Sequence, residues 1–198
     1  MTDKKVIGLT GSIASGKSTV SHLLEQQFGG HIICADSVGK EVAQKGQEGY
    51  EKILELFSTD FLQEDGELNR KKLGNYVFAH PEELKKLNGC LHPIILKTIL
   101  QRAGELDGLV VVDCALLIET GLDRHVDEVW VVYTPKELRI QRVMARDGVS
   151  YEDAVNRVNS QMPDEEKLKY ADRVIYGEKD EAYLLEQLQQ ILGKRKEV

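Results

Sequence analysis

The sequence is poor in cysteine and has no long apolar run. Its three cysteines, Cys34, Cys90 and Cys114, lie far apart and form no Cys-x-x-Cys pair, which argues against a disulfide framework. We expect free thiols, with Cys34 and Cys114 buried in strand-like runs. No apolar segment approaches the roughly 20 residues that span a membrane. The polar first residues enter a strand without a signal-peptide core, so we predict a cytoplasmic protein.

Acidic residues outnumber basic ones, with 33 Asp and Glu against 26 Lys and Arg. The 198 residues carry a formal net charge of −7, whereas general binders of nucleic acids or membrane surfaces are normally basic. We therefore expect neither as a partner, and no obligate protein partner is implied. Any phosphate group must be held by a local cluster of positive charge. The sequence also lacks zinc-ligand spacing, Gly-x-Ser-x-Gly and the guanine-reading Asn-Lys-x-Asp.

The segment 11–19 carries the clearest chemistry. It reads Gly11, Ser12, Ile13, Ala14, Ser15, Gly16, Lys17, Ser18 and Thr19, and residues 11–18 match the phosphate-binding pattern G-x-x-x-x-G-K-[ST]. A strand-like run precedes it and a helical pattern follows it. In that setting backbone amides and the helix N-terminus bind phosphate, Lys17 reaches the β and γ phosphates, and Ser18 ligates Mg²⁺. We expect this segment to bind ATP; the alternative is a glycine-rich turn without a ligand.

Strands and helices alternate along the chain. Strand-like runs lie at 5–10, 31–35, 109–113, 126–133 and 172–176. This alternation predicts an α/β fold of the P-loop type, a parallel sheet flanked by helices. We place its core at about 1–36, 108–134 and 170–198. Between them, about 37–107 contains only helical patterns and is predicted to be a helical substrate-binding insertion. Its helical stretches lie at 46–57, 70–78, 81–90 and 93–106.

A helical hairpin is expected to form a lid over about 135–165. Thr134 and the following proline are expected to cap a helix over 135–146. Ser150 is expected to cap a second helix over 150–160, with a turn at 147–148 between the two. A closing amphipathic helix at about 180–192 precedes a polar tail.

Two aspartates follow predicted strands at the edge from which the phosphate loop leaves the sheet. Asp36 can accept a hydroxyl proton from a substrate; the alternative is an N-cap for the helix beginning at Ser37. Asp36 to Gly39 also matches the D-x-x-G of switch GTPases, which is a weak match. Asp113 ends its strand as a Walker-B aspartate does and can hold Mg²⁺; the alternative is a bond to the loop serine or to backbone.

Three arginines share one face of the first lid helix. Arg139, Arg142 and Arg146 are spaced by three and four residues, so their guanidinium groups can cover ATP, neutralise its γ-phosphate and exclude water. The alternative is an exposed face with salt bridges to Glu137 and Asp147.

The insertion contains two further candidates. Arg70 belongs to the basic cluster Asn69-Arg70-Lys71-Lys72, and His92 lies at Leu91-His92-Pro93, where we expect two helices to join. Both can bind an anionic acceptor. A solvated helix start and a buried histidine at a bend are the alternatives.

Taken together, the motifs resemble those of dephospho-coenzyme A kinases over nearly the whole chain. They are residues 10–19, Ala35-Asp36, Leu91-His92-Pro93, Asp113-Cys114-Ala115-Leu116-Leu117-Ile118-Glu119, Ser160-Gln161-Met162-Pro163 and Ala171-Asp172-Arg173-Val174-Ile175. Many families share the phosphate loop, but the segments at 113–119 and 160–163 are more specific. The sequence departs from the family at Lys40, Ala115 and Gly177, where arginine, proline and asparagine are common.

The resemblance implies a P-loop kinase core with a helical substrate domain and a lid. It also implies transfer of the γ-phosphate of ATP to the ribose 3′-hydroxyl of dephospho-coenzyme A, the last step of coenzyme A synthesis. The residues assigned on this basis are Asp36, Lys17 and Arg142 for catalysis, the loop with Arg142 and Arg146 for ATP, Ser18 and Asp113 for Mg²⁺, and Asp36, Arg70, His92, Leu117 and Glu119 for the acceptor. Rival interpretations are a P-loop kinase of a nucleoside monophosphate or small alcohol, and a nucleotide-dependent switch protein.

Overall fold

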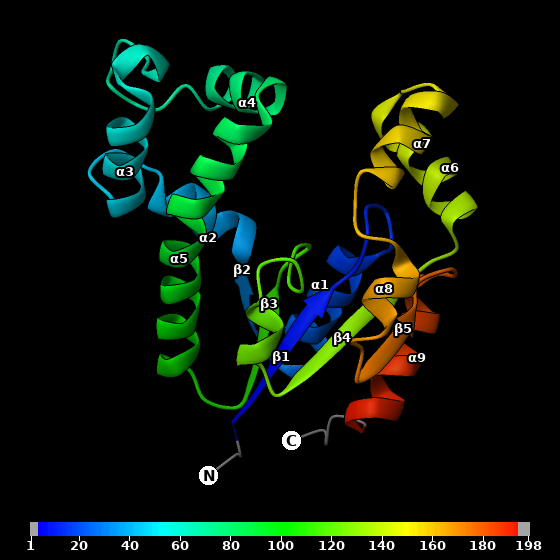
Figure 1. Cartoon of the computed structure of the whole chain (residues 1–198). Coiled ribbons are helices and arrows are strands. Elements are labelled where there is room, and N and C mark those ends of the chain that lie inside the picture. The colour runs from blue at the N-terminus through cyan, green and yellow to red at the C-terminus, as the bar shows by residue number, and fades with distance from the viewer. Residues whose placement is uncertain (1–3, 194–198) are drawn as a thin grey trace. The chain divides into compact units, whose positions relative to one another are not determined.

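The computed structural model describes residues 4–193 (Figure 1). Within them, five strands form one sheet in the order β2-β3-β1-β4-β5. The strands are β1 (Lys5–Thr10), β2 (His31–Cys34), β3 (Leu109–Asp113), β4 (Glu128–Tyr133) and β5 (Arg173–Tyr176). The pairs β1–β3, β1–β4 and β4–β5 are parallel. The predicted parallel α/β fold is therefore confirmed.

The helices fill the connections between the strands. They are α1 (Lys17–Phe28), α2 (Ala35–Val42), α3 (Glu48–Phe57), η1 (Thr59–Phe61), α4 (Arg70–Ala79), α5 (Pro81–Glu105), η2 (Leu122–His125), α6 (Lys136–Asp147), α7 (Tyr151–Asn159), α8 (Asp164–Leu168) and α9 (Glu181–Leu192). The short α8 was not predicted. The predicted polar tail lies, from residue 194 onward, outside the described residues.

Three strands differ from their predicted bounds by one or two residues. β2 ends at Cys34 because α2 begins at the next residue. β4 begins at Glu128 rather than 126, and two residues outside any helix or strand separate it from η2, which ends at His125. β5 begins at Arg173, since the carboxylate of Asp172 accepts a hydrogen bond from the Val129 amide at 2.8 Å. The end of β2 thus lies next to a helix, whereas the start of β5 lies next to Asp172.

One compact unit joins the residues before Cys34 to those after Gly104 and contains most of the sheet. Leu9 and its register partner Trp130 lie on one face, where the apolar sides of α1 and α9 pack against them. On the opposite face, a Cβ on Gly8 would lie 2.7 Å from a methyl group of Leu117. This packing holds β1 in the middle of the sheet, so the phosphate loop leaves the sheet at its centre (Figure 1).

The second compact unit, Cys34–Gly104, is built from α2, α3, η1, α4 and most of α5. It has a hydrophobic core of its own. The core residues are Ala43, Tyr50, Ile53, Phe57, Leu68, Leu73 and Val77. The insertion predicted at about 37–107 falls on this unit, and its role in binding the acceptor stays a prediction.

The α6–α7 hairpin has one of its two predicted caps. The chain turns at Gly148, whose φ of 64° is left-handed, and the Ser150 hydroxyl accepts a hydrogen bond from the Asp153 amide at 3.1 Å. Thr134 does not cap α6, because Pro135 is the N-cap residue. The Thr134 hydroxyl instead donates to the carbonyl oxygen of Ser15 at 2.8 Å. The Thr134 side chain therefore bonds to a distant residue, although the local sequence predicts that it caps a helix.

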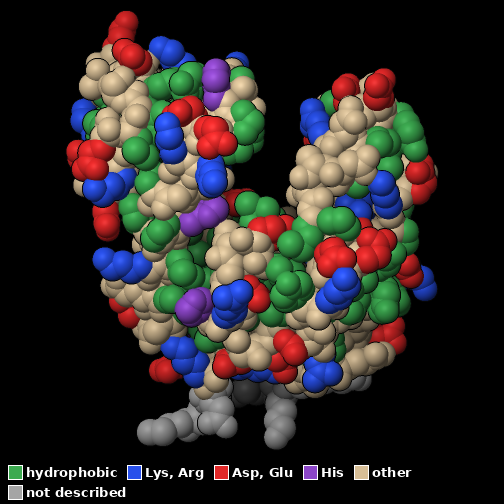
Figure 2. Space-filling view, in the orientation of Figure 1, with side chains coloured by type: hydrophobic (Ala, Val, Ile, Leu, Met, Phe, Trp, Pro, Cys, Tyr) green, Lys and Arg blue, Asp and Glu red, His purple; other side chains and the backbone are tan. Residues whose placement is uncertain are grey.

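The structure tests the expectations for the cysteines and for membrane-spanning helices. All three cysteines are free thiols, as predicted. Cys114 is buried, but Cys34 is only half-buried, because it ends the edge strand β2. No helix within residues 4–193 has both the length and the apolar character needed to cross a membrane. On the face shown in Figure 2, acidic and basic side chains are interspersed.

The predicted break between two helices at Leu91-His92-Pro93 is wrong. A single helix, α5, runs from Pro81 to Glu105 with Pro93 inside it. A proline in a helix loses one hydrogen bond and its ring crowds the carbonyl group four residues earlier. That carbonyl belongs to Gly89, and a Cβ there would meet nothing within 4 Å. The helix nevertheless continues past the proline.

We expect Pro93→Ala to stabilise the protein. Pro93 is exposed, and alanine restores the hydrogen bond to Gly89 without removing a packed side chain. The free energy of unfolding should rise by about 1–3 kcal/mol, as measured by urea denaturation. A lower free energy of unfolding would mean that the shape imposed by the proline is itself required by the packing of α5.

Candidate active site

The phosphate loop connects the end of β1 to the start of α1. Two of its residues have a left-handed backbone, Ala14 with φ of 61° and Gly16 with φ of 97°. The Ser15 amide donates to the Ser12 carbonyl oxygen at 3.1 Å, and the Val20 amide donates to the Gly16 carbonyl oxygen at 3.1 Å. Left-handed residues in a tight loop turn successive amides inward, and the N-terminus of α1 adds partial positive charge. The loop therefore has the backbone shape that binds an anion.

Lys17 forms an ion pair with Asp113 at the carboxyl end of β3. The pair follows from the register of the sheet, because Asp113 lies opposite Leu9, next to the start of the loop. Asp113 is 8% exposed, whereas Ser18, in the first turn of α1, is exposed. The structure thus brings Lys17 and Asp113 together. The alternative partners proposed for Asp113, the loop serine or backbone, are not the ones it uses.

The segment around the start of α8 holds the other side of the loop. The Ser12 hydroxyl donates to Asp164 at 2.7 Å, and the Ile13 amide donates to the side-chain oxygen of Gln161 at 2.7 Å. The side chains of Ile13 and Ala14 pack against the apolar cluster inside the α6–α7 hairpin. Sequence reasoning missed Asp164. The only signal near it was the Ser-Gln-Met-Pro segment.

The three arginines of α6 do not act as one face. Arg142 donates to the Ala14 carbonyl oxygen at 3.2 Å, so it lies beside the loop as predicted. Arg139 is 3% exposed and pairs with Asp164. Arg146 is exposed and pairs with Asp147, which lowers the pKa of that carboxyl group. The local salt bridge that we gave as the alternative is therefore present at Arg146, and its assignment to ATP stays a prediction.

Leu117 and Glu119 have structural partners. Leu117 is 0% exposed and packs against Gly8. Glu119 pairs at 2.9 Å with Lys167, a lysine that is 1% exposed. The same ammonium donates to the carbonyl oxygen of Ala115 at 3.0 Å. This segment is therefore fixed by core packing and by one buried cation, and the acceptor-binding assignments of Leu117 and Glu119 stay predictions.

The second unit contains the remaining candidates. Asp36 is exposed in the first turn of α2 and is not an N-cap, because that position belongs to Cys34. Arg70 donates to the carbonyl oxygen of Lys40 at 2.7 Å. His92 is half-buried on α5, and burial lowers the pKa of its imidazole. The Asp36 carboxylate is thus exposed and accepts no hydrogen bond from any of the described residues.

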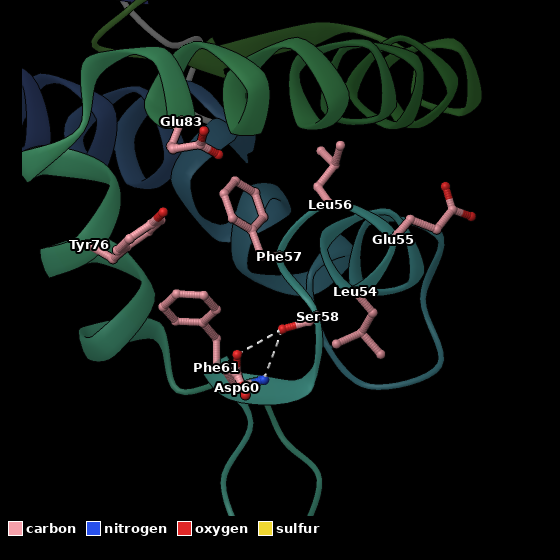
Figure 3. A pocket seen from close by; sticks show the side chains of 9 residues that line it. All are labelled: Leu54, Glu55, Leu56, Phe57, Ser58, Asp60, Phe61, Tyr76 and Glu83. Atoms are coloured by element: carbon pink, nitrogen blue, oxygen red, sulfur yellow. Dashed lines mark hydrogen bonds between the residues drawn. The ribbon is translucent and has the colours of Figure 1, made fainter.

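A pocket of about 450 Å³ also lies in the second unit, and the sequence did not indicate it (Figure 3). Its walls come from α3, η1, α4 and the start of α5. The lining residues are Leu54, Glu55, Leu56, Phe57, Ser58, Asp60, Phe61, Tyr76 and Glu83. None of the residues assigned to the acceptor from the sequence lines this pocket.

Two residues in or beside the loop have oxygen atoms that suit a metal ion. Among residues 4–193 no three or more His, Cys, Asp or Glu side chains are grouped to hold one. Ser18 and Asp113 supply a hydroxyl and a carboxylate, the hard donors that Mg²⁺ prefers. Such a pair fits a metal whose other ligands come from nucleotide phosphates and water.

Comparisons with known proteins show the family of this chain. A family model described as dephospho-CoA kinase matches residues 5–182. The chain belongs to the dephospho-CoA kinase family. It is 44% identical over 195 residues to the dephospho-CoA kinase of Carboxydothermus hydrogenoformans, covering 96% of this chain and 94% of that one. The family resemblance in the motifs is therefore confirmed.

Solved structures extend the comparison. The dephospho-CoA kinase of Campylobacter jejuni is 32% identical, with a TM-score of 0.64 and coverage of 96% of both chains. A Thermus thermophilus protein is 33% identical, with a TM-score of 0.82, covering 96% of this chain and 97% of that one. The fold of this dephospho-CoA kinase family member is thus found in solved structures over 96% of the chain.

Gly177 packs closely against the backbone of the phosphate loop. It directly follows β5, and its amide donates to the Tyr133 carbonyl oxygen at 2.8 Å. A Cβ at this position would overlap the Ser15 carbonyl oxygen and lie 2.7 Å from the Thr134 hydroxyl. In this chain the loop therefore occupies space that the asparagine common in the family would need.

We expect Gly177→Ala to displace the loop, because its methyl group meets loop backbone. Affinity for ATP should fall on the order of ten-fold, about 1.4 kcal/mol, and stability by about 1–3 kcal/mol. Calorimetric titration with ATP and thermal unfolding test this. Gly74→Ala is the matched control, since a Cβ on that helical glycine meets nothing within 4 Å and should change neither quantity for the worse. Wild-type ATP affinity in Gly177→Ala would contradict the expectation.

His92 predicts a pH dependence of stability. Burial lowers the pKa of its imidazole in the folded state, so the unfolded chain binds this proton at higher pH than the folded chain. The free energy of unfolding must therefore fall as pH drops through about 6.5, the ordinary value for histidine. His92→Gln should lose less stability than wild type between about pH 7.5 and about pH 5.5 in urea titrations. His22→Gln, at an exposed histidine, is the control; equal losses in wild type and His92→Gln would contradict this account.

Proposed function

We propose that this protein transfers the γ-phosphate of ATP to the ribose 3′-hydroxyl of dephospho-coenzyme A, giving coenzyme A and ADP. The observation that carries the proposal is its membership of the dephospho-CoA kinase family, over 5–182, together with an anion-binding loop between β1 and α1. This is the final step of coenzyme A biosynthesis. Neither rival interpretation, another P-loop kinase or a switch protein, is favoured by any relative named above.

In the proposed mechanism the loop amides and the N-terminus of α1 bind the phosphates of ATP. Lys17, held near the end of β3 by Asp113, places its ammonium at the β and γ phosphates. Arg142 lies against the Ala14 carbonyl oxygen, so its guanidinium can reach the charge that spreads over the transferring group. These groups position and stabilise; they form no covalent bond with the substrate.

Asp36 is the proposed base. Its exposed carboxylate stands two residues after the carboxyl end of β2, the strand next to β3 in the sheet. It would accept the proton of the 3′-hydroxyl as that oxygen bonds to the γ-phosphorus and the bond between this phosphorus and the β,γ-bridging oxygen breaks. The proton ends on Asp36 and the bond electrons leave with ADP. Arg70 and His92, in the same unit, are proposed to bind the anionic acceptor.

Magnesium is part of the proposal. Ser18 and Asp113 would hold it, and it would neutralise charge on the β and γ phosphates when bound. We also propose that the enzyme works in the cytoplasm, in line with its free thiols.

An acceptor panel tests the function. ADP release should depend on dephospho-coenzyme A, and mass spectrometry should show a product heavier by one phosphate at the ribose 3′ position. Nucleoside monophosphates and small alcohols should support little turnover. Turnover that is faster with another alcohol, or that needs a macromolecule, would reject the proposal.

Asp36→Asn tests the base. Loss of a general base should reduce kcat by roughly 10²–10⁴-fold, with the dissociation constant for ATP nearly unchanged because the loop is untouched. Steady-state kinetics and calorimetry measure the two effects separately. Glu48→Gln removes an exposed carboxylate from the first turn of α3 and is the matched control, expected to keep wild-type kcat. Wild-type kcat in Asp36→Asn would remove Asp36 from this role.

A further inference from the structure

Asp164 connects the phosphate loop to helix α6. One of its carboxylate oxygens accepts the Ser12 hydroxyl hydrogen bond at 2.7 Å, and the other forms an ion pair with Arg139. Ser12 is 4% exposed, Arg139 is 3% exposed, and the side chain of Asp164 is 15% exposed. The bridge is thus almost completely removed from solvent.

The same network reaches the loop a second time. The Nε of Arg139 donates to the Thr134 carbonyl oxygen at 3.0 Å, and the Thr134 hydroxyl donates to the Ser15 carbonyl oxygen at 2.8 Å. Thr134 is 0% exposed. The contacts run from Ser12 through Asp164, Arg139 and Thr134 back to Ser15. They therefore hold the loop on both sides of Ala14, one of its two residues with a left-handed backbone.

Stability alone explains this network poorly. Taking a guanidinium and a carboxylate out of water costs free energy that their attraction often only offsets. The Nη1 group of Arg139 is buried with no hydrogen-bond partner among the described residues, which adds to that cost. A loop that must present its amides in one geometry, by contrast, gains directly from side chains that fix its carbonyl and hydroxyl groups.

We propose that Asp164 and Arg139 are positioning residues that hold the phosphate loop in its nucleotide-binding conformation. They act through Ser12 and Thr134 and do not touch the nucleotide. The proposal rests on the proposed function only in that the loop binds adenine nucleotides. It separates Arg139 from Arg142, which lies one helical turn away and meets the loop directly.

Calorimetric titration with ADP tests the proposal, because it needs no acceptor. Asp164→Ala should weaken ADP binding about ten-fold, as expected for losing a hydrogen bond to a charged group, while KM for dephospho-coenzyme A at saturating ATP stays within about two-fold. The double variant Ser12→Ala with Asp164→Ala should bind no more weakly than Asp164→Ala alone, since both changes break the same link. Glu165→Ala, an exposed carboxylate one residue along α8, is the matched control and should bind ADP like wild type.

Asp164→Ala leaves a buried guanidinium unpaired and can unfold for that reason. In that case Ser12→Ala and Thr134→Val test the proposal. Each removes a hydrogen bond between the network and the loop, and Arg139 keeps its ion pair with Asp164. Either should weaken ADP binding several-fold, with little change in thermal unfolding. Wild-type ADP affinity in folded Asp164→Ala, or in both loop-side variants, would overturn the proposal, as would additive losses in the double variant. A wild-type protein that binds ADP but does not phosphorylate dephospho-coenzyme A would reject the proposed function and leave this test intact.

Discussion

The phosphate loop depends on a backbone shape that it cannot hold by itself. Ala14 has a left-handed backbone although it carries a Cβ, a conformation that costs of order 1–3 kcal/mol and persists only when its surroundings impose it. Those surroundings come from distant parts of the chain. Thr134 and Gly177 lie against Ser15, and the start of α8 holds Ser12 and Ile13. The shape of the loop thus depends on several distant segments of the first unit.

The sheet supplies the frame for these contacts. Because β1 lies between β3 and β4, the loop that follows it is flanked by the ends of both neighbours. The end of β3 brings Asp113 to Lys17, and the end of β4 leads to Thr134. In parallel sheets ligands bind where the connections from two neighbouring strands leave in opposite directions. Here that point lies between β1, which connects toward β2, and β3, which connects toward β4. One strand order therefore brings both the Lys17–Asp113 pair and Thr134 to the loop.

Local sequence signals were reliable where the chemistry is local. The glycine loop, the strand bounds of β1 and β3, the turn at Gly148 and the Ser150 cap depend on residues within a few positions of one another. They failed where a distant group competes for the same side chain. Thr134 bonds to the loop rather than to α6, and Pro93 is tolerated within α5. Neither outcome has a signature in the neighbouring residues.

The sequence by itself determined the fold class, the phosphate loop and the family, because periodicity, glycine placement and motif order are encoded residue by residue. Only the tertiary structure decided which side chains serve the loop. It placed Arg142 beside Ala14 and buried Arg139 against Asp164, and it turned Arg146 to Asp147, although the three arginines have equivalent spacing on one helix. It also put Leu117 in the core. The physical reason is that helix periodicity fixes the direction in which a side chain points. The partner of that side chain depends on which distant element packs there.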